Sequence, residues 1–426
     1  MPKPDHDALH RLLVDLCRRD APSTLGPRVL EPLRSDDAWT AFLERATAHR
    51  VGGVVLTALE RLSKASPEVA ALVPGPRLAP LRLLRRQALG WDLEQARVLA
   101  WLGKHGIEPI VLKGCALRHT CYGESAERPV SDLDLLFESA QLNDARVHLA
   151  ALGYVDPNSD ARNALYRRHH FHLQMEHPSG FAIELHWALT PPGPRGRIDP
   201  IDVRTGATRI AGATLPFKAA CPEHTVLHLA SQAAEGSLSH LGRIVDIDRI
   251  VAAAGDDFDW GALAEVARRG DLENAVAVAT SMAAQLFGTP VPPDFPRALG
   301  VSGWSRRNLR ALDPVRWILD QTALRYMAAG VVMRFWLEST AAARADVLLQ
   351  ACGLRRNPMR LLDRGREDAP ESAGIRLRMR VPTVFKIASL QAAAWLASAT
   401  PPAPRALPRL WDRPEARSTS PEAPAP

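Results

Sequence analysis

The sequence lacks the features that would place it at once in a disulfide-rich, secreted or membrane class. It has five cysteines, Cys17, Cys115, Cys121, Cys221 and Cys352, with no Cys-x-x-Cys pair. An odd count without paired spacing indicates neither a disulfide framework nor a cysteine zinc site. No apolar run reaches the about 18 residues of a membrane span, and the amino-terminal residues are too polar for a signal peptide. We therefore expect a cytoplasmic protein without a transmembrane segment.

Aromatic residues and lysines are also scarce. Aromatic residues make up 6% of the chain, and only six of the 53 basic residues are lysines. Alanine and leucine dominate the apolar residues, which favours helices. The formal net charge is +6, but the basic residues are scattered and form no stripe. Nucleic-acid binding therefore stays open but is not favoured.

The pattern along the chain predicts an α+β fold, with a small mixed sheet flanked by helical regions. Apolar residues at helical spacing predict helices from 5 to 103 and again from 220 to about 355. Short apolar runs between them predict strands, two of which form a hairpin around Pro178-Ser179-Gly180. The predicted regions are 1–104 (helical), 105–190 (α/β core), 191–219 (linker and loop), 220–375 (helical), 376–400 (amphipathic) and 401–426 (disordered, proline-rich).

Two aspartates, Asp132 and Asp134, stand in the run Val130 to Phe137, which otherwise reads as a buried strand. Alternate side chains of a strand share a face, so both carboxylates point the same way, about 7 Å apart along the strand. Two like charges on one face repel, and a divalent cation removes that penalty. Carboxylate oxygens are the ligands that Mg²⁺ prefers, so the pair predicts a magnesium site.

The second strand of the hairpin, Phe181 to Leu189, has the same alternation. Glu184 and His186 share its polar face. If this strand lies near the aspartate strand, Glu184 completes a three-carboxylate site. Such a site holds the two metal ions that in-line nucleotidyl transfer requires. We expect His186 to contact the ligands or the substrate.

Lys113 and Gly114 follow a short apolar run and precede a short predicted helix. Glycine allows the backbone to approach a phosphate, and a helix amino terminus attracts anions. Lys113, where arginine is the common choice of this chain, predicts an ammonium beside a triphosphate. The alternative is a lysine that only keeps a strand edge soluble.

Taken in order, these motifs resemble a known family. The segments VLKGCALRHTCYGESAERPVSDLDLLF, IELHWAL and PEHTVLHLASQAAEGSLSHLGRIVDIDRIV are similar to the bacterial family of uncharacterised nucleotidyltransferases, within the DNA polymerase beta-like superfamily. The resemblance covers roughly 105 to 255. It implies that Gly114 belongs to the phosphate-side turn and that Asp132, Asp134 and Glu184 are the metal ligands. The superfamily's usual turn is Gly-Ser or Gly-Gly, whereas this chain has Lys-Gly-Cys, so Lys113 is expected to replace the serine contact.

Other candidate residues have two interpretations each. Arg128 is either a turn residue or a phosphate contact. Asp246 either pairs with Arg243 or Arg249 on its helix, which is the commoner case, or lies on the substrate side. Cys115 is more simply a core residue than a reactive thiol. The histidines between 169 and 186 have no metal-ligand spacing, so we do not expect a zinc site. Residues 376–400 are more simply a docking helix than a membrane-surface helix.

These observations together predict an enzyme that transfers a nucleoside monophosphate from an NTP, such as ATP, to a hydroxyl or phosphate acceptor on a small molecule, peptide or protein. Two Mg²⁺ ions are the expected cofactors, and the acceptor stays open. The first alternative is a catalytically silent nucleotide-binding or regulatory protein of the same fold. The second is an RNA-modifying or toxin-like nucleotidyltransferase.

Overall fold

A computed structural model describes residues 6–351, apart from 22–24, 26, 195, 212–214, 237, 304–308, 310–312 and 320–332. The predictions for the amphipathic segment 376–400 and the tail 401–426 lie outside the described residues. Within the described part of the chain, no helix combines the length and apolar character needed to cross a membrane.

A six-stranded mixed sheet lies at the centre of the fold, in the strand order β3-β4-β2-β1-β6-β5. Strand β2 is antiparallel to β1 and parallel to β4, while β3 and β4 form the predicted antiparallel hairpin. The predicted α+β class is therefore confirmed. The strands are β1 (Ile110–Val111), β2 (Leu133–Leu136), β3 (His172–Glu176), β4 (Ala182–His186), β5 (Thr208–Ile210) and β6 (Phe217–Ala219).

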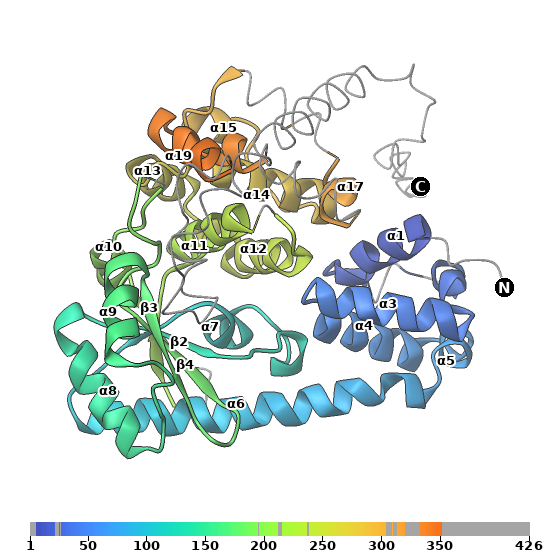
Figure 1. The fold of residues 1–426 in the computed structure, drawn as a ribbon. Coiled ribbons are helices and arrows are strands. Elements are labelled where there is room, and N and C mark those ends of the chain that lie inside the picture. Colours follow the sequence, from blue (N-terminus) through green and yellow to red (C-terminus); the bar gives the residue numbers. More distant parts are fainter. Residues whose placement is uncertain are drawn as a thin grey trace, which may run out of the picture.

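Helices surround this sheet and make up most of the described chain (Figure 1). Those before the sheet are α1 (His6–Cys17), α3 (Asp36–Ala48), α4 (Gly52–Ala65), α5 (Pro67–Leu72) and α6 (Ala79–Lys104). Those within the sheet region are α7 (Lys113–Thr120), α8 (Leu142–Ala151), α9 (Asp160–His169) and α10 (Pro200–Thr205). Those after it are α11 (Pro222–Glu235), α12 (Leu241–Ala254), α13 (Trp260–Arg269), α14 (Glu273–Phe287), α15 (Phe295–Ala298), α17 (Pro314–Leu319) and α19 (Ala341–Ala351).

The 26-residue helix α6 joins the amino-terminal helices to the sheet. In Figure 1 it runs from the α5 end of those helices to the underside of the sheet. It ends two residues before Gly106, whose φ of +74° suits a glycine after a helix end. Trp91, Val98 and Leu102 of α6 pack with Leu133 and Leu135 of β2 in one buried cluster. The last half of α6 thus packs as part of the sheet region, although the sequence grouped it with the amino-terminal helices.

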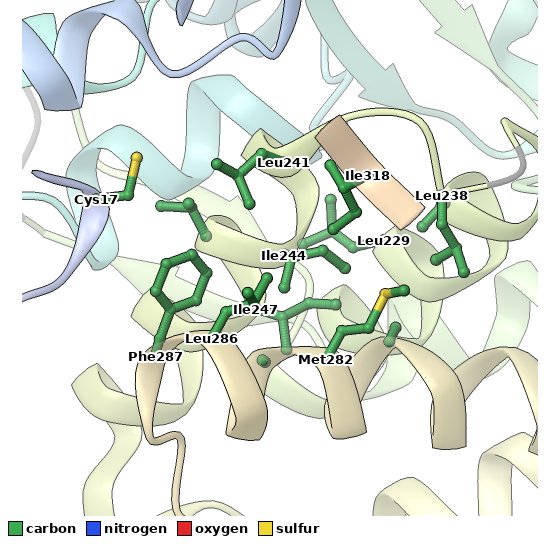
Figure 2. Close-up of a cluster of buried hydrophobic side chains, with 14 of the residues drawn as sticks. Cys17, Leu229, Leu238, Leu241, Ile244, Ile247, Met282, Leu286, Phe287 and Ile318 are labelled. Carbon is green, nitrogen blue, oxygen red and sulfur yellow. The ribbon is translucent and has the colours of Figure 1, made fainter. Parts of the chain in front are cut away.

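The opposite face of the sheet contributes to a larger buried cluster. This cluster also contains residues of helices that come before and after the sheet in the sequence. Leu136 and Ile110 of the sheet join residues of α1, α4, α11, α12 and α14 in that cluster. Figure 2 shows part of it, where Cys17 of α1 lies with Ile247 of α12 and Leu286 of α14. The two faces of β2 are therefore both buried, and its polar residues lie in protein interior rather than on an open surface.

The segment 191–219, predicted as linker and loop, is the main correction to the secondary structure. It contains α10 and the two strands β5 and β6, and β6 pairs in parallel with β1. Each of these strands is three residues long, too short for alternation of polar and apolar residues to stand out. The prolines and glycines before α10 are typical of a loop, so the sequence pattern predicted a loop for the whole segment.

Candidate nucleotidyl-transfer site

The register of the central strands brings two of the predicted acids side by side. In the parallel pair of β2 and β4, Asp134 lies opposite Glu184. Neighbouring residues in register point to the same face of a sheet. Glu184 therefore lies on the aspartate face, as the sequence required. Asp134 is 3% exposed, so this acid is buried inside the fold.

Lys113 joins these two carboxylates. Its Nζ lies 2.6 Å from Asp134 Oδ1 and 3.5 Å from Glu184 Oε2. Burial opposes the charge on Lys113, but the two carboxylates outweigh it and raise the pKa of the ammonium. The backbone of Lys113 has a φ of +50°, in the left-handed region, at the start of α7. This unusual turn directs the side chain back over the sheet.

His186 is fully buried and faces the same two acids. Its Nε2 lies 2.9 Å from Asp134 Oδ1 and 3.1 Å from Glu184 Oε2, so this nitrogen donates to carboxylate oxygens. Burial opposes ionisation of Glu184, but the hydrogen bond from His186 and the charge of Lys113 hold the pKa of this carboxyl well below its usual range. The expectation that His186 contacts the acidic ligands agrees with this geometry.

Asp132 differs from Asp134 and Glu184, because no basic side chain in the described part of the chain forms an ion pair with it. Burial, followed by the charges of Asp134 and Glu184, raises its pKa from 3.8 to about 6. A carboxyl in this position favours a nearby positive ion, which would relieve the repulsion. The donor set of Asp132, Asp134 and Glu184 consists of hard oxygen atoms and therefore fits Mg²⁺.

Gly114 packs too tightly for a side chain. A Cβ built there would lie 2.7 Å from Val130 Cγ1 and 3.7 Å from the Arg128 guanidinium. The glycine thus lets α7 approach the segment that leads into β2. It also places Arg128 beside the start of α7, where the sequence expected phosphate contacts.

Arg128 is held by Asp246 of α12. Its Nε donates to both carboxylate oxygens, at 2.8 and 3.1 Å, and Nη1 donates to the Pro129 carbonyl. Tyr122 donates a further hydrogen bond, 2.6 Å long, to Asp246. The expected helix pairing of Asp246 with Arg243 or Arg249 is therefore replaced by a longer-range ion pair. Sequence spacing could not show this, because Arg128 and Asp246 lie 118 residues apart.

Cys115 follows Gly114 and is buried at 1% exposure, with its Sγ 3.3 Å from the Asp132 carbonyl. Burial raises the pKa of this thiol. The interpretation as a core residue therefore fits better than a reactive thiol. The other cysteines in the described part of the chain are also free thiols.

Two histidines beside the acids were missed by sequence reasoning. His172 of β3 lies opposite His186 in the antiparallel register, and its Nε2 is 3.6 Å from Glu184 Oε1. His228 of α11 is 3% exposed, and its pKa is lowered by burial and by the nearby charges of Lys113 and His186. Strand pairing, rather than spacing along the sequence, brings the rings of His172 and His186 together. Only the register of the predicted hairpin could have indicated that His172 lies beside His186.

A pocket of about 620 Å³ lies beyond the carboxyl end of β4. Trp187, which directly follows His186, lines it together with His170 and four arginines, Arg167, Arg168, Arg197 and Arg269. The His170 ring lies 4.1 Å from that of His172, centroid to centroid. The pocket is therefore next to the acidic cluster. Its lining also includes Asp199 and Asp202, and Asp202 pairs with Arg269 at 2.8 Å, so the four arginines leave a net positive charge.

The predicted site residues thus form two adjacent groups. Lys113, Asp134, Glu184 and His186 contact one another in one cluster, and Asp132, just before β2, interacts electrostatically with it. Arg128 and Asp246 form an ion pair beside Gly114.

Comparison with known families agrees with this arrangement. A family model described as "Uncharacterised nucleotidyltransferase" matches residues 35–288, which is more than half of the chain and includes all six strands and every residue of the site. The chain belongs to this nucleotidyltransferase family. No curated protein and no solved structure gives a significant match.

Proposed function

We propose that the protein is a Mg²⁺-dependent enzyme of the DNA polymerase beta-like superfamily, bacterial and cytoplasmic. It transfers a nucleoside monophosphate from an NTP, such as ATP, to a hydroxyl or phosphate acceptor. The observation that carries the proposal is the register of Asp134 with Glu184, which brings these two carboxylates side by side, with Asp132, just before β2, close enough to feel the charge of both.

Each residue of the cluster has a role in this chemistry. Asp132, Asp134 and Glu184 would hold Mg²⁺, which when bound lowers the pKa of the attacking hydroxyl and stabilises charge on the leaving oxygens. Lys113 and the amide groups after Gly114 would bind the triphosphate. Arg128, beside Gly114, bonds to Asp246 through Nε and to the Pro129 carbonyl through Nη1. Its Nη2 has no partner in the described part of the chain and would be available for a phosphate oxygen.

The transfer itself is a single displacement at the α-phosphorus. The acceptor oxygen forms a bond to that phosphorus, the bond to the bridging β-phosphate oxygen breaks, and pyrophosphate leaves. Glu184 would accept the proton of the attacking hydroxyl. We infer that the acceptor enters from the arginine-lined pocket beyond His186, which suits a molecule that carries a phosphate or carboxylate group.

One observation supports the silent alternative. The ammonium of Lys113 already lies between Asp134 and Glu184, where a metal ion would neutralise them. A protein of this kind would bind a nucleotide through Lys113 without turnover. Measurements of turnover and metal binding on the same variants separate the two functions.

The test is a pair of substitutions in the aspartates. The double variant Asp132→Asn with Asp134→Asn should lose pyrophosphate release from labelled NTP by at least about 10³-fold, because metal stabilisation contributes several kcal/mol. It should also lose Mg²⁺·NTP binding in calorimetry while keeping its circular dichroism spectrum. Asp144→Asn, an exposed acid on α8, is the matched control. Unchanged Mg²⁺·NTP affinity in the double variant contradicts the proposed site.

A further inference from the structure

We propose that His172, Glu184 and His186 bind a divalent transition-metal ion, such as Zn²⁺ or Fe²⁺, with Mn²⁺ as its paramagnetic probe, beside the position that Asp132 and Asp134 offer to Mg²⁺. The inference goes beyond the proposed function, since it requires neither a nucleotide nor turnover.

The strand register creates this site. His172 and His186 are direct partners in the antiparallel pair of β3 and β4, and Glu184 is two residues before His186 on the same strand. Side chains two apart on a strand share a face, and partners in register share it too. All three side chains therefore point to one side of the sheet. Their potential ligand atoms all lie within 4.8 Å of one another.

The measured distances match a coordination shell. His186 Nε2 lies 3.1 Å from Glu184 Oε2, and His172 Nε2 lies 3.6 Å from Glu184 Oε1. A metal about 2.1 Å from each ligand atom requires neighbouring ligand atoms about 3.0–3.4 Å apart, depending on geometry. The three ligand atoms lie within 4.8 Å of one another, so side-chain rotations would have to bring them closer to hold one ion.

The ligand types select the metal. Two imidazoles with one carboxylate suit zinc and non-haem iron, whereas Mg²⁺ prefers oxygen ligands alone. Within the described chain, the buried Nδ1 atoms of His172 and His186 have no hydrogen-bond partner. In each ring, Nε2 could therefore bind the metal while Nδ1 carries the one remaining ring proton.

Lys113 does not block this position. Its closer partner is Asp134, at 2.6 Å, and its 3.5 Å contact with Glu184 is the weaker of the two. Lys113 would keep its contact with Asp134 while Glu184 turns to the metal. The charge of the ion would then be shared between Glu184 and the neighbouring Asp134.

The test is pulsed electron paramagnetic resonance on the full chain loaded with Mn²⁺ alone. Nitrogen-14 modulation should report imidazole coordination in the wild type. His172→Gln, at the 15% exposed edge of the site, and His186→Gln should each reduce this modulation and weaken Mn²⁺ binding at least about tenfold. His177→Gln, on the turn of the same hairpin, is the matched control and should change neither.

The outcomes separate this site from the proposed function. Nitrogen coupling that is lost in His172→Gln but kept in Asp132→Asn supports the site, whether or not NTP turnover is found. Absence of coupling in the wild type, or equal coupling in all the histidine variants, overturns it. Circular dichroism identifies any variant that does not fold. If His186→Gln does not fold, the His172→Gln variant alone tests the metal site.

Discussion

At the scale of single residues, Lys113 combines a backbone and an electrostatic feature. A positive φ at a non-glycine residue destabilises the fold by about 1–3 kcal/mol, so this backbone conformation persists only where surrounding contacts fix it. Here the ammonium is fixed by Asp134 and Glu184. The strained turn therefore serves to place a positive charge over two buried acids, beside the helix start where phosphate would bind.

Lys113→Met tests whether that charge binds the nucleotide. The variant keeps a side chain of similar length but loses the ammonium, so Mg²⁺·NTP affinity measured by calorimetry should fall at least about tenfold, or about 1.4 kcal/mol. Lys104→Met, at the exposed end of α6, is the control. Tighter Mg²⁺·NTP binding in Lys113→Met would instead show that the ammonium competes with the metal for Asp134 and Glu184 and does not bind the nucleotide.

At the scale of elements, Arg85 of α6 connects three segments. Its guanidinium donates to both oxygens of Glu60 on α4, at 2.9 and 2.6 Å. It also donates to both oxygens of Glu124, which precedes the short helix η3 (Ser125–Glu127), at 2.9 and 3.0 Å. This network links α4 to α6. It also links both helices to the segment that leads into β2.

Arg85→Gln should lower the free energy of unfolding by about 1 kcal/mol at pH 7, the upper end for partly exposed pairs, because Arg85 serves two acids. The hydrogen bond with Arg85 lowers the pKa of Glu60 from 4.5 to about 2. A lowered acid pKa stabilises the fold above the unfolded value and loses that effect as pH falls from about 4.5 to 2.

The difference between Arg85→Gln and the wild type should therefore shrink over that range of pH. Urea unfolding at several pH values measures it, with Arg86→Gln, an exposed neighbour on α6, as control. A difference that stays constant down to pH 2 would contradict the role of Glu60.

At the scale of the whole molecule, the amino-terminal and carboxyl-terminal helices share one core. Leu13 of α1 is 0% exposed and belongs to the same buried cluster as Ile247 of α12 and Met282 of α14. Figure 1 shows α6 spanning the distance between the first helices and the sheet. We therefore expect these parts to unfold together rather than as separate units.

Leu13→Ala should lower the free energy of unfolding by about 3 kcal/mol, because the cavity that it leaves lies in a packed core. Leu83→Ala removes the same atoms at a position that is 56% exposed and should cost far less. Urea unfolding followed by tryptophan fluorescence should show one transition, since Trp39 on α3 reports the amino-terminal helices and Trp260 on α13 reports the carboxyl-terminal helices. Two separate transitions would disprove the shared core.

Much of the site could be predicted from the sequence. Alternation placed Asp132 with Asp134 and Glu184 with His186 on polar strand faces, because the period of a strand is a local property. The helical spacing and Gly106 predicted the long stretch that ends in α6. The pairings across the chain could not be predicted in this way. Arg128 with Asp246, and His172 with His186, depend on which strands and helices become neighbours.

The sequence by itself determined the α+β class, the hairpin and the identity of the acids, since periodicity and residue type act over a few positions. Only the tertiary structure decided that Asp134 lies in register with Glu184, that the ammonium of Lys113 contacts both carboxylates, and that two histidines lie beside them. It also decided that 191–219 contributes two strands. The physical reason is that these features depend on pairing and burial between distant segments, whose free energy no local pattern records.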